Sequence, residues 1–174
     1  MSIFPGLQSL QCYLHPTDGT GILPVLAHPS LRTLSLNLIL LTTVNACALP
    51  LDLSIFPALS DLNITWSARA PGEQELASLI DATLGAPGLR RLAFKRPWSS
   101  ETRPFTLDHL RRVVRGLPKL EWVSVYRLHE GSGEGGDEKR IPRVRRILVG
   151  DGLVEESLQK ACQVSGPVVI ELNV

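Results

Sequence analysis

Chemically reactive residue types are scattered along this sequence and form no recognisable active-site pattern. Cys12 and His15 have the C-x-x-H spacing of half a zinc site, but no second pair completes the four ligands that structural zinc requires. The other histidines lack a nucleophile or paired carboxylate at a spacing typical of hydrolases: His28, His109 and His129. We therefore predict no catalytic, cofactor-binding or metal-binding residues, and a protein that is not an enzyme.

One segment, EGSGEGGDEKR at residues 130–140, is rich in glycine and charge. A phosphate-binding loop would follow a strand and end in G-K-S or G-K-T, and this segment does neither. We predict a flexible insertion at residues 130–140.

Positive charge is concentrated in the second half of the chain. Residues 90–146 hold 15 of the 18 Lys and Arg and 7 of the 17 Asp and Glu, a local balance of +8 in a chain of net charge +1. Arginines beside Trp98, Trp122 and Tyr126 could bind an acidic or phosphorylated peptide, or nucleic acid. A solvated basic surface is the alternative. We expect an acidic protein partner rather than nucleic acid.

An internal repeat predicts the elements that position these residues. Apolar residues follow a proline at offsets of two, five and seven residues, as in Pro29–Leu31–Leu34–Leu36. Seven prolines start such segments, on average 27 residues apart: Pro5, Pro29, Pro57, Pro87, Pro118, Pro142 and Pro167. Alternating apolar residues indicate a short strand with one buried face, and the proline suits the turn before it. The leucine after the proline is expected to tuck under the strand.

The segments between the strands should return the chain along the other face. Helical stripes predict helices within 73–86, 106–117 and 151–163, with Gly85 as a C-cap and Thr106 as an N-cap. The returns around 21–28 and 46–55 are short and broken by proline, so we expect a single turn or irregular chain there. The sequence therefore predicts one α/β domain, residues 1–174, with a parallel sheet of about seven strands.

Repeats such as FPGLQSLQC, FPALSDLNI and LPKLEWVSV resemble the degenerate leucine-rich repeats of F-box proteins, especially fungal ones. The resemblance implies a right-handed, ribonuclease-inhibitor-like solenoid, with its strands on the concave face. In F-box proteins such a domain selects the substrate of a ubiquitin ligase. No F-box is visible before the first repeat, so we expect only substrate-type binding to carry over. The first repeat also lacks a visible cap, which suggests a fragment or end-to-end association.

The leading hypothesis is therefore a non-catalytic protein-interaction domain. Its predicted partner-binding residues lie on or beside the concave face: Tyr13, Asn37, Asn63, Lys95, Ser124, Tyr126, Arg90, Arg91, Arg127 and Trp98. One alternative is a binder of acidic, phosphorylated or nucleic-acid ligands through residues 90–146. Another is a regulator of small GTPases, as some leucine-rich-repeat proteins are.

Bulk properties bear on the compartment. Three cysteines form an odd, scattered set, which favours a reducing environment. The N-terminal residues lack the basic start and long apolar run of a signal peptide, and no apolar run approaches the ~20 residues needed to span a bilayer. We expect a cytoplasmic or nuclear protein with no membrane partner.

Overall fold

The structure is a computed structural model that describes residues 6–14, 19–40, 51–67, 71–95, 105–125, 128–129, 146–149 and 169–172. The predicted insertion at 130–140 and the predicted helix within 151–163 lie outside these residues.

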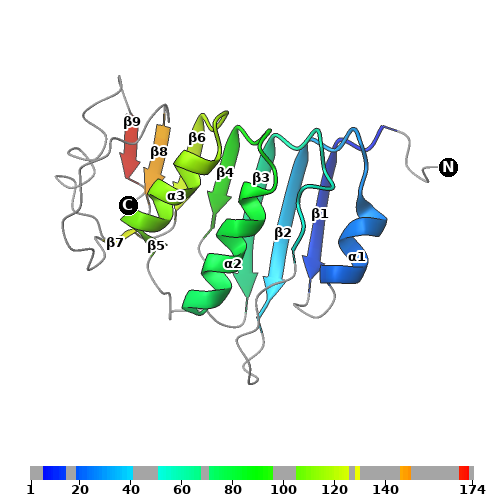
Figure 1. Cartoon of the computed structure of the whole chain (residues 1–174), viewed down its shortest axis with the longest axis horizontal. Helices are drawn as coiled ribbons and strands as arrows, with labels where there is room; N and C mark the ends of the chain where they lie inside the picture. Colours follow the sequence, from blue (N-terminus) through cyan, green and yellow to red (C-terminus); the bar gives the residue numbers. More distant parts are fainter. Residues whose placement is uncertain are drawn as a thin grey trace.

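The described chain forms a parallel sheet whose strands follow one another in chain order (Figure 1). Its seven strands are β1 (Ser9–Leu14), β2 (Thr33–Ile39), β3 (Asp61–Ser67), β4 (Arg91–Phe94), β6 (Trp122–Val125), β8 (Arg146–Val149) and β9 (Val169–Leu172). Each pairs in parallel with the next. A second parallel pair joins β5 (Phe105–Thr106) to β7 (Leu128–His129). The prediction of an α/β chain with a parallel sheet is confirmed.

Three helices lie on one side of the main sheet: α1 (Gly19–Leu26), α2 (Glu73–Leu84) and α3 (Leu107–Gly116) (Figure 1). Leu76, Leu79 and Ile80 of α2 and Leu110 of α3 are buried in one apolar cluster with the inward side chains of the strands. The helices therefore cover one face of the sheet, and the core lies between the two layers.

A β-turn precedes each of four strands and contains the repeated proline. The N–H groups that close these turns, each donating over 3.1 Å to the carbonyl three residues earlier, belong to Leu31, Leu59, Leu89 and Leu120. The proline is the second residue of each turn, where its fixed φ fits without strain. The closing leucines are at most 3% exposed. Pro-x-Leu thus makes a turn and buries its last side chain.

Adjacent repeats are joined by the same backbone contact just before four of the strands. One carbonyl accepts two consecutive N–H groups from the next repeat, over distances of 2.8 to 3.0 Å. The accepting carbonyls belong to Gln8, Arg32, Ser60 and Arg90. This contact fixes where each strand begins relative to the one before it.

The core is built from rows of equivalent residues on successive strands. Leu34, Leu62, Leu92 and Val123 lie side by side and are each at most 1% exposed. In β1 the equivalent residues are only partly buried: Leu10, beside Leu34, and Cys12, beside Leu36. Burial raises the pKa of the Cys12 thiol, because the thiolate would lose hydration there.

The predicted alignment of the seventh repeat is wrong by two residues. The repeat pattern places Leu172 beside Ile147, whereas Ile147 lies beside Ile170 and Leu172 beside Val149. A shift of two residues keeps every side chain on its own face of the sheet, so the alternation of apolar residues cannot distinguish the two registers.

The first return also differs from expectation. A single turn or irregular chain was predicted around 21–28, but α1 is an eight-residue helix with Pro24 inside it. Proline keeps a helical φ, but inside a helix it removes one N–H donor and its ring crowds the carbonyl four residues earlier. The preceding Leu23 is 1% exposed, and its burial offsets much of that cost. Residues 51–55 of the second return contain no helix, as predicted.

The caps predicted for the two long helices are present. The backbone N–H of His109 donates to the Thr106 hydroxyl oxygen over 3.3 Å, and the N–H of Thr106 donates to His109 Nδ1 over 3.2 Å. The helix α2 ends at Gly85, whose φ of −65° is right-handed rather than the left-handed form common for glycine caps. Across the described residues, no helix has both the length and the apolar character needed to cross a membrane.

Candidate binding face of the sheet

The side of the main sheet turned away from the helices carries polar side chains. Because neighbouring residues of a strand point to opposite faces, the residues between the buried leucines share this side. We call it the polar face. On β1, β2, β3, β4 and β6 its residues include three rows: Ser9, Thr33, Asp61, Arg91 and Trp122; Gln11, Ser35, Asn63, Ala93 and Ser124; and Tyr13, Asn37 and Thr65.

Several predicted binding residues lie on this face. Tyr13 is 64% exposed on β1, at one edge of the main sheet, and Asn37, Asn63 and Ser124 are partly exposed on the strands that follow. Lys95 directly follows β4 and is exposed, with its N–H donating to the carbonyl of Ile64 over 2.8 Å. The structure thus brings predicted residues from several repeats onto one surface.

The two predicted arginines occupy different positions. Arg91 is the first residue of β4 and belongs to the polar face, whereas Arg90 directly precedes the strand. Three further predicted residues, Trp98, Tyr126 and Arg127, lie outside the described residues.

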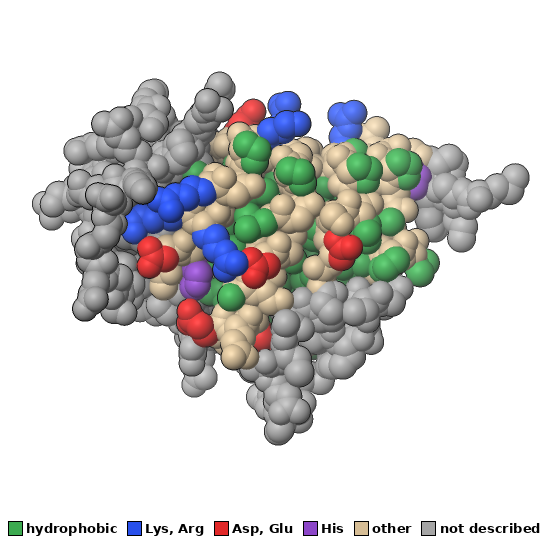
Figure 2. Space-filling view, in the orientation of Figure 1, with side chains coloured by type: hydrophobic (Ala, Val, Ile, Leu, Met, Phe, Trp, Pro, Cys, Tyr) green, Lys and Arg blue, Asp and Glu red, His purple; other side chains and the backbone are tan. Residues whose placement is uncertain are grey.

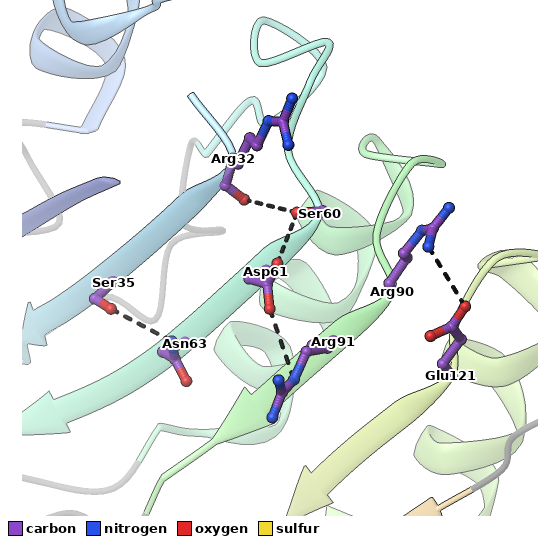
Figure 3. A network of polar contacts seen from close by, with 8 residues as sticks. All are labelled: Arg32, Ser35, Ser60, Asp61, Asn63, Arg90, Arg91 and Glu121. Carbon is purple, nitrogen blue, oxygen red and sulfur yellow. Dashed lines mark hydrogen bonds and ion pairs between the residues drawn. The ribbon is translucent and has the colours of Figure 1, made fainter. Parts of the chain in front are cut away.

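Three polar-face residues from successive strands interact in the first row, and Figure 3 shows two of them, Asp61 and Arg91. Arg91 Nε lies 3.6 Å from Asp61 Oδ1, and Arg91 Cζ lies 5.2 Å from the centre of the Trp122 ring. On the other side of the carboxylate, the Ser60 hydroxyl donates to Asp61 Oδ2 over 2.6 Å. This row therefore holds a cation between a carboxylate and an aromatic ring.

The second and third rows have fewer polar contacts. Asn63 Nδ2 donates to Ser35 Oγ over 3.4 Å, which links β3 to β2. Asn37 Oδ1 is buried and has no hydrogen-bond partner among the described residues. Ala93 is 1% exposed between Asn63 and Ser124, so it contributes little to the surface.

The basic residues that the structure describes within 90–146 are divided between two sides of the molecule. Arg90 pairs with Glu121 over 3.7 Å at the strand starts (Figure 3). On the helix side, Arg111 pairs with Asp108, and Arg112 pairs with Asp81 and thereby joins α3 to α2. Figure 2 shows this helix side, where basic and acidic side chains lie next to one another over the α2 and α3 region. Four described arginines of this segment therefore have an acidic neighbour: Arg90, Arg91, Arg111 and Arg112.

Sequence reasoning missed Asp61 as a surface residue and did not connect it with Arg91. The signal was present, because both residues stand four positions after a repeat proline, at the offset that Thr33 and Trp122 also occupy. Period-two alternation places that offset on the same face as Asn63. The prediction included Arg91 for its charge, but it drew its other outward-facing strand residues only from the two later offsets.

The helix side holds a shallow hollow of about 290 Å³ between residues 51–53 and α2. Two carboxylates line it, Asp52 and Asp81. The Ser54 hydroxyl and the Ser54 N–H both donate to Asp52 and lower the pKa of its carboxyl, the hydroxyl by more. Asp81 pairs with Arg112. Both carboxylates therefore already have partners within the chain.

The described residues bring together no three His, Cys, Asp or Glu side chains that could hold a metal ion. The polar face is the candidate site because it is the surface on which several repeats present polar side chains in register.

No protein-family model matches the chain, and neither a curated protein nor a solved structure does.

Proposed function

We propose that this chain is a leucine-rich-repeat solenoid of ribonuclease-inhibitor type that works as a non-catalytic protein-interaction domain. Three features that recur at the same repeat positions support the fold: the proline turn, the row of buried leucines, and the carbonyl that accepts two N–H groups. In such solenoids each repeat contacts its neighbours and the strand face curves inward, which makes an extended binding surface.

The observation that carries the function is the regular array on the polar face. Strand register holds the side chains of Tyr13, Asn37 and Thr65 in one row and those of Ser35, Asn63 and Ser124 in the next. Side chains already held in position lose less conformational freedom when a partner binds. The surface is therefore suited to recognising another protein.

The resemblance to F-box proteins extends this proposal to what happens to the bound protein. The domain would select a protein for ubiquitination, in the cytoplasm or the nucleus. Regulation of small GTPases stays a prediction that no described contact favours.

Binding of acidic or nucleic-acid ligands through residues 90–146 is the second candidate. The exposed Arg91 favours an acidic ligand, since its side chain is 61% exposed. The ion pairs of Arg90, Arg111 and Arg112 weaken the case for nucleic acid, because each brings a carboxylate close to the surface a phosphate would approach.

Photo-crosslinking tests the proposed function. A photoreactive phenylalanine analogue replaces Tyr13 or Asn63 on the polar face, and Gln74, which is exposed on α2, serves as the matched control. We expect both polar-face positions to yield the same protein adduct from native extract and the α2 position not to yield it. Asn63→Arg should abolish the adduct at Tyr13, because a large cation would stand in the middle of the face.

Absence of a specific adduct at both polar-face positions, or the same adducts at Gln74, would contradict the proposal. Ubiquitination of the crosslinked protein in the presence of the chain would support the ligase part. Unchanged ubiquitination when the chain carries Asn63→Arg would remove that part alone.

A further inference from the structure

Arg91 is held in one orientation by residues from the strands on either side of it. Asp61 on β3 contacts the Nε edge over 3.6 Å (Figure 3), and the centre of the Trp122 ring on β6 lies 5.2 Å from the guanidinium carbon. Asp61 is itself held by the Ser60 hydroxyl over 2.6 Å. A guanidinium oriented in this way loses less freedom when it binds a ligand than a freely rotating side chain does.

The terminal nitrogens of Arg91 remain free for a ligand. Its ion pair with Asp61 involves Nε, and Nη1 and Nη2 have no partner among the residues that the structure describes. The Arg91 side chain is 61% exposed, against 32% for Asp61. Two terminal N–H groups in one plane match the two oxygens of a carboxylate, and such paired hydrogen bonds are among the stronger ones.

The charge around Arg91 favours an acidic ligand. Among the described residues up to Val125, the cations on the polar face or along the strand starts are Arg32, Arg90, Arg91 and Lys95, against the carboxylates of Asp61 and Glu121. The difference is two positive charges. Asn63 and Ser124 lie in the adjacent row, where amide and hydroxyl groups can bond to a peptide backbone.

We propose that the polar face binds an acidic peptide segment and that Arg91, stacked on Trp122, receives one of its carboxylates. This deepens the proposed function, on which it rests, by naming the chemistry of the partner. Lys95 adds a second cation directly after the other end of β4.

Nucleic acid fits this surface less well. A base would need the face of Trp122 for stacking, and Arg91 already lies against that ring. A phosphate backbone would also meet a surface with only a small net positive charge, because Asp61 and Glu121 stand among the cations.

Fluorescence anisotropy with a labelled oligoglutamate peptide tests the proposal, with an oligoglutamine peptide and a single-stranded oligonucleotide as comparison probes. Arg91→Gln removes the proposed receptor. Arg90→Gln is the matched control, since it removes the same charge from the neighbouring residue, whose side chain is also 61% exposed. We expect Arg91→Gln to weaken oligoglutamate binding by about tenfold or more, and Arg90→Gln to weaken it by less than about threefold.

Two further variants separate charge from geometry. Arg91→Lys keeps the charge but loses the planar pair of donors, and Trp122→Leu removes the ring that orients the guanidinium. Both should weaken binding by an intermediate factor. Oligoglutamine should not bind measurably.

Equal losses in Arg91→Gln and Arg90→Gln would overturn the proposal, as would tighter binding of the oligonucleotide or no binding of oligoglutamate by the wild-type chain. These results are distinguishable from failure of the proposed function. If Tyr13 and Asn63 still crosslink a specific protein and Arg91→Gln leaves that adduct unchanged, the interaction domain stands and the acidic-peptide assignment falls.

Discussion

Through its side chain, His109 contacts three neighbours at the start of α3: Phe105, Thr106 and Glu73. It is the third residue of α3, and its Nδ1 accepts the N–H of Thr106 while its own backbone N–H donates to the Thr106 hydroxyl. Its ring stands edge-on to Phe105, with centroids 5.3 Å apart, and Nε2 lies 3.7 Å from Glu73. Burial lowers the pKa of His109, an effect that the nearby carboxylates of Glu73 and Asp108 oppose.

This arrangement predicts a loss of stability in mild acid. The pKa of His109 lies below 6.5 in the folded protein, so the unfolded chain binds its proton first as the pH falls. The contribution of His109 is complete above the unfolded pKa and is lost as the pH falls through the folded pKa. His109→Gln keeps a side-chain acceptor at the same helix position but does not titrate, and it should show a flatter dependence of the unfolding temperature on pH between about 5 and 7. If His109→Gln left the pH dependence of the unfolding temperature unchanged, His109 would not be the cause of the loss of stability in acid.

At the scale of single elements, α3 depends on its first turn. The Thr106 hydroxyl satisfies one of the N–H groups that a helix start leaves without a partner, and Asp108 adds negative charge near the positive end of the helix dipole. The capping residue and the buried stripe of Leu110, Val113 and Val114 together explain why this segment is helical.

Removing that cap should cost measurable stability. We expect Thr106→Ala to lower the free energy of unfolding by about 1 kcal/mol, and Thr106→Ser to lower it much less because the hydroxyl is retained. Urea denaturation followed by circular dichroism measures both. Equal losses in the two variants would show that the threonine methyl group, rather than the hydroxyl, stabilises α3.

At the scale of the whole molecule, the buried rows should differ in strength along the sheet. Leu62 is 1% exposed on β3 with strands on both sides, whereas Leu10, in the same row, is only partly buried on β1. We expect Leu62→Ala to cost about 2–5 kcal/mol and Leu10→Ala about 1 kcal/mol or less. The midpoints of urea unfolding give the comparison. Similar costs at the two positions would mean that β1 is as well packed as the centre of the sheet.

Much of the architecture could be predicted because it depends on residues that repeat. Leu34, Leu62 and Leu92 share one offset from a proline and lie side by side, since a parallel register aligns equivalent residues. The two-turn helix α1 could not be predicted, because local propensity counts Pro24 as a breaker and does not count the burial of Leu23. The register of β9 was missed because a two-residue slip preserves the alternation.

The candidate site was predictable only in part, for a different reason. Exposure of Tyr13 and Asn63 follows from alternation within one strand, which the sequence displays directly. The contact of Arg91 with Asp61 and Trp122 depends on which residues of three strands stand opposite one another, at an offset that carries no apolar signal. Partners across strands become visible only once the register is known.

Pairing in the main sheet joins each strand only to the strands before and after it in chain order. Such a sheet can gain or lose a whole unit without rethreading the rest of the chain, whereas one inserted residue within a strand would misplace every side chain after it. Excision of residues 61–90 would bring Arg91 next to Thr33, the position that Asp61 now holds. Duplication and deletion of complete units would thus be the route by which this chain changes length. Each such event would also change which charged residues lie side by side on the newly paired strands.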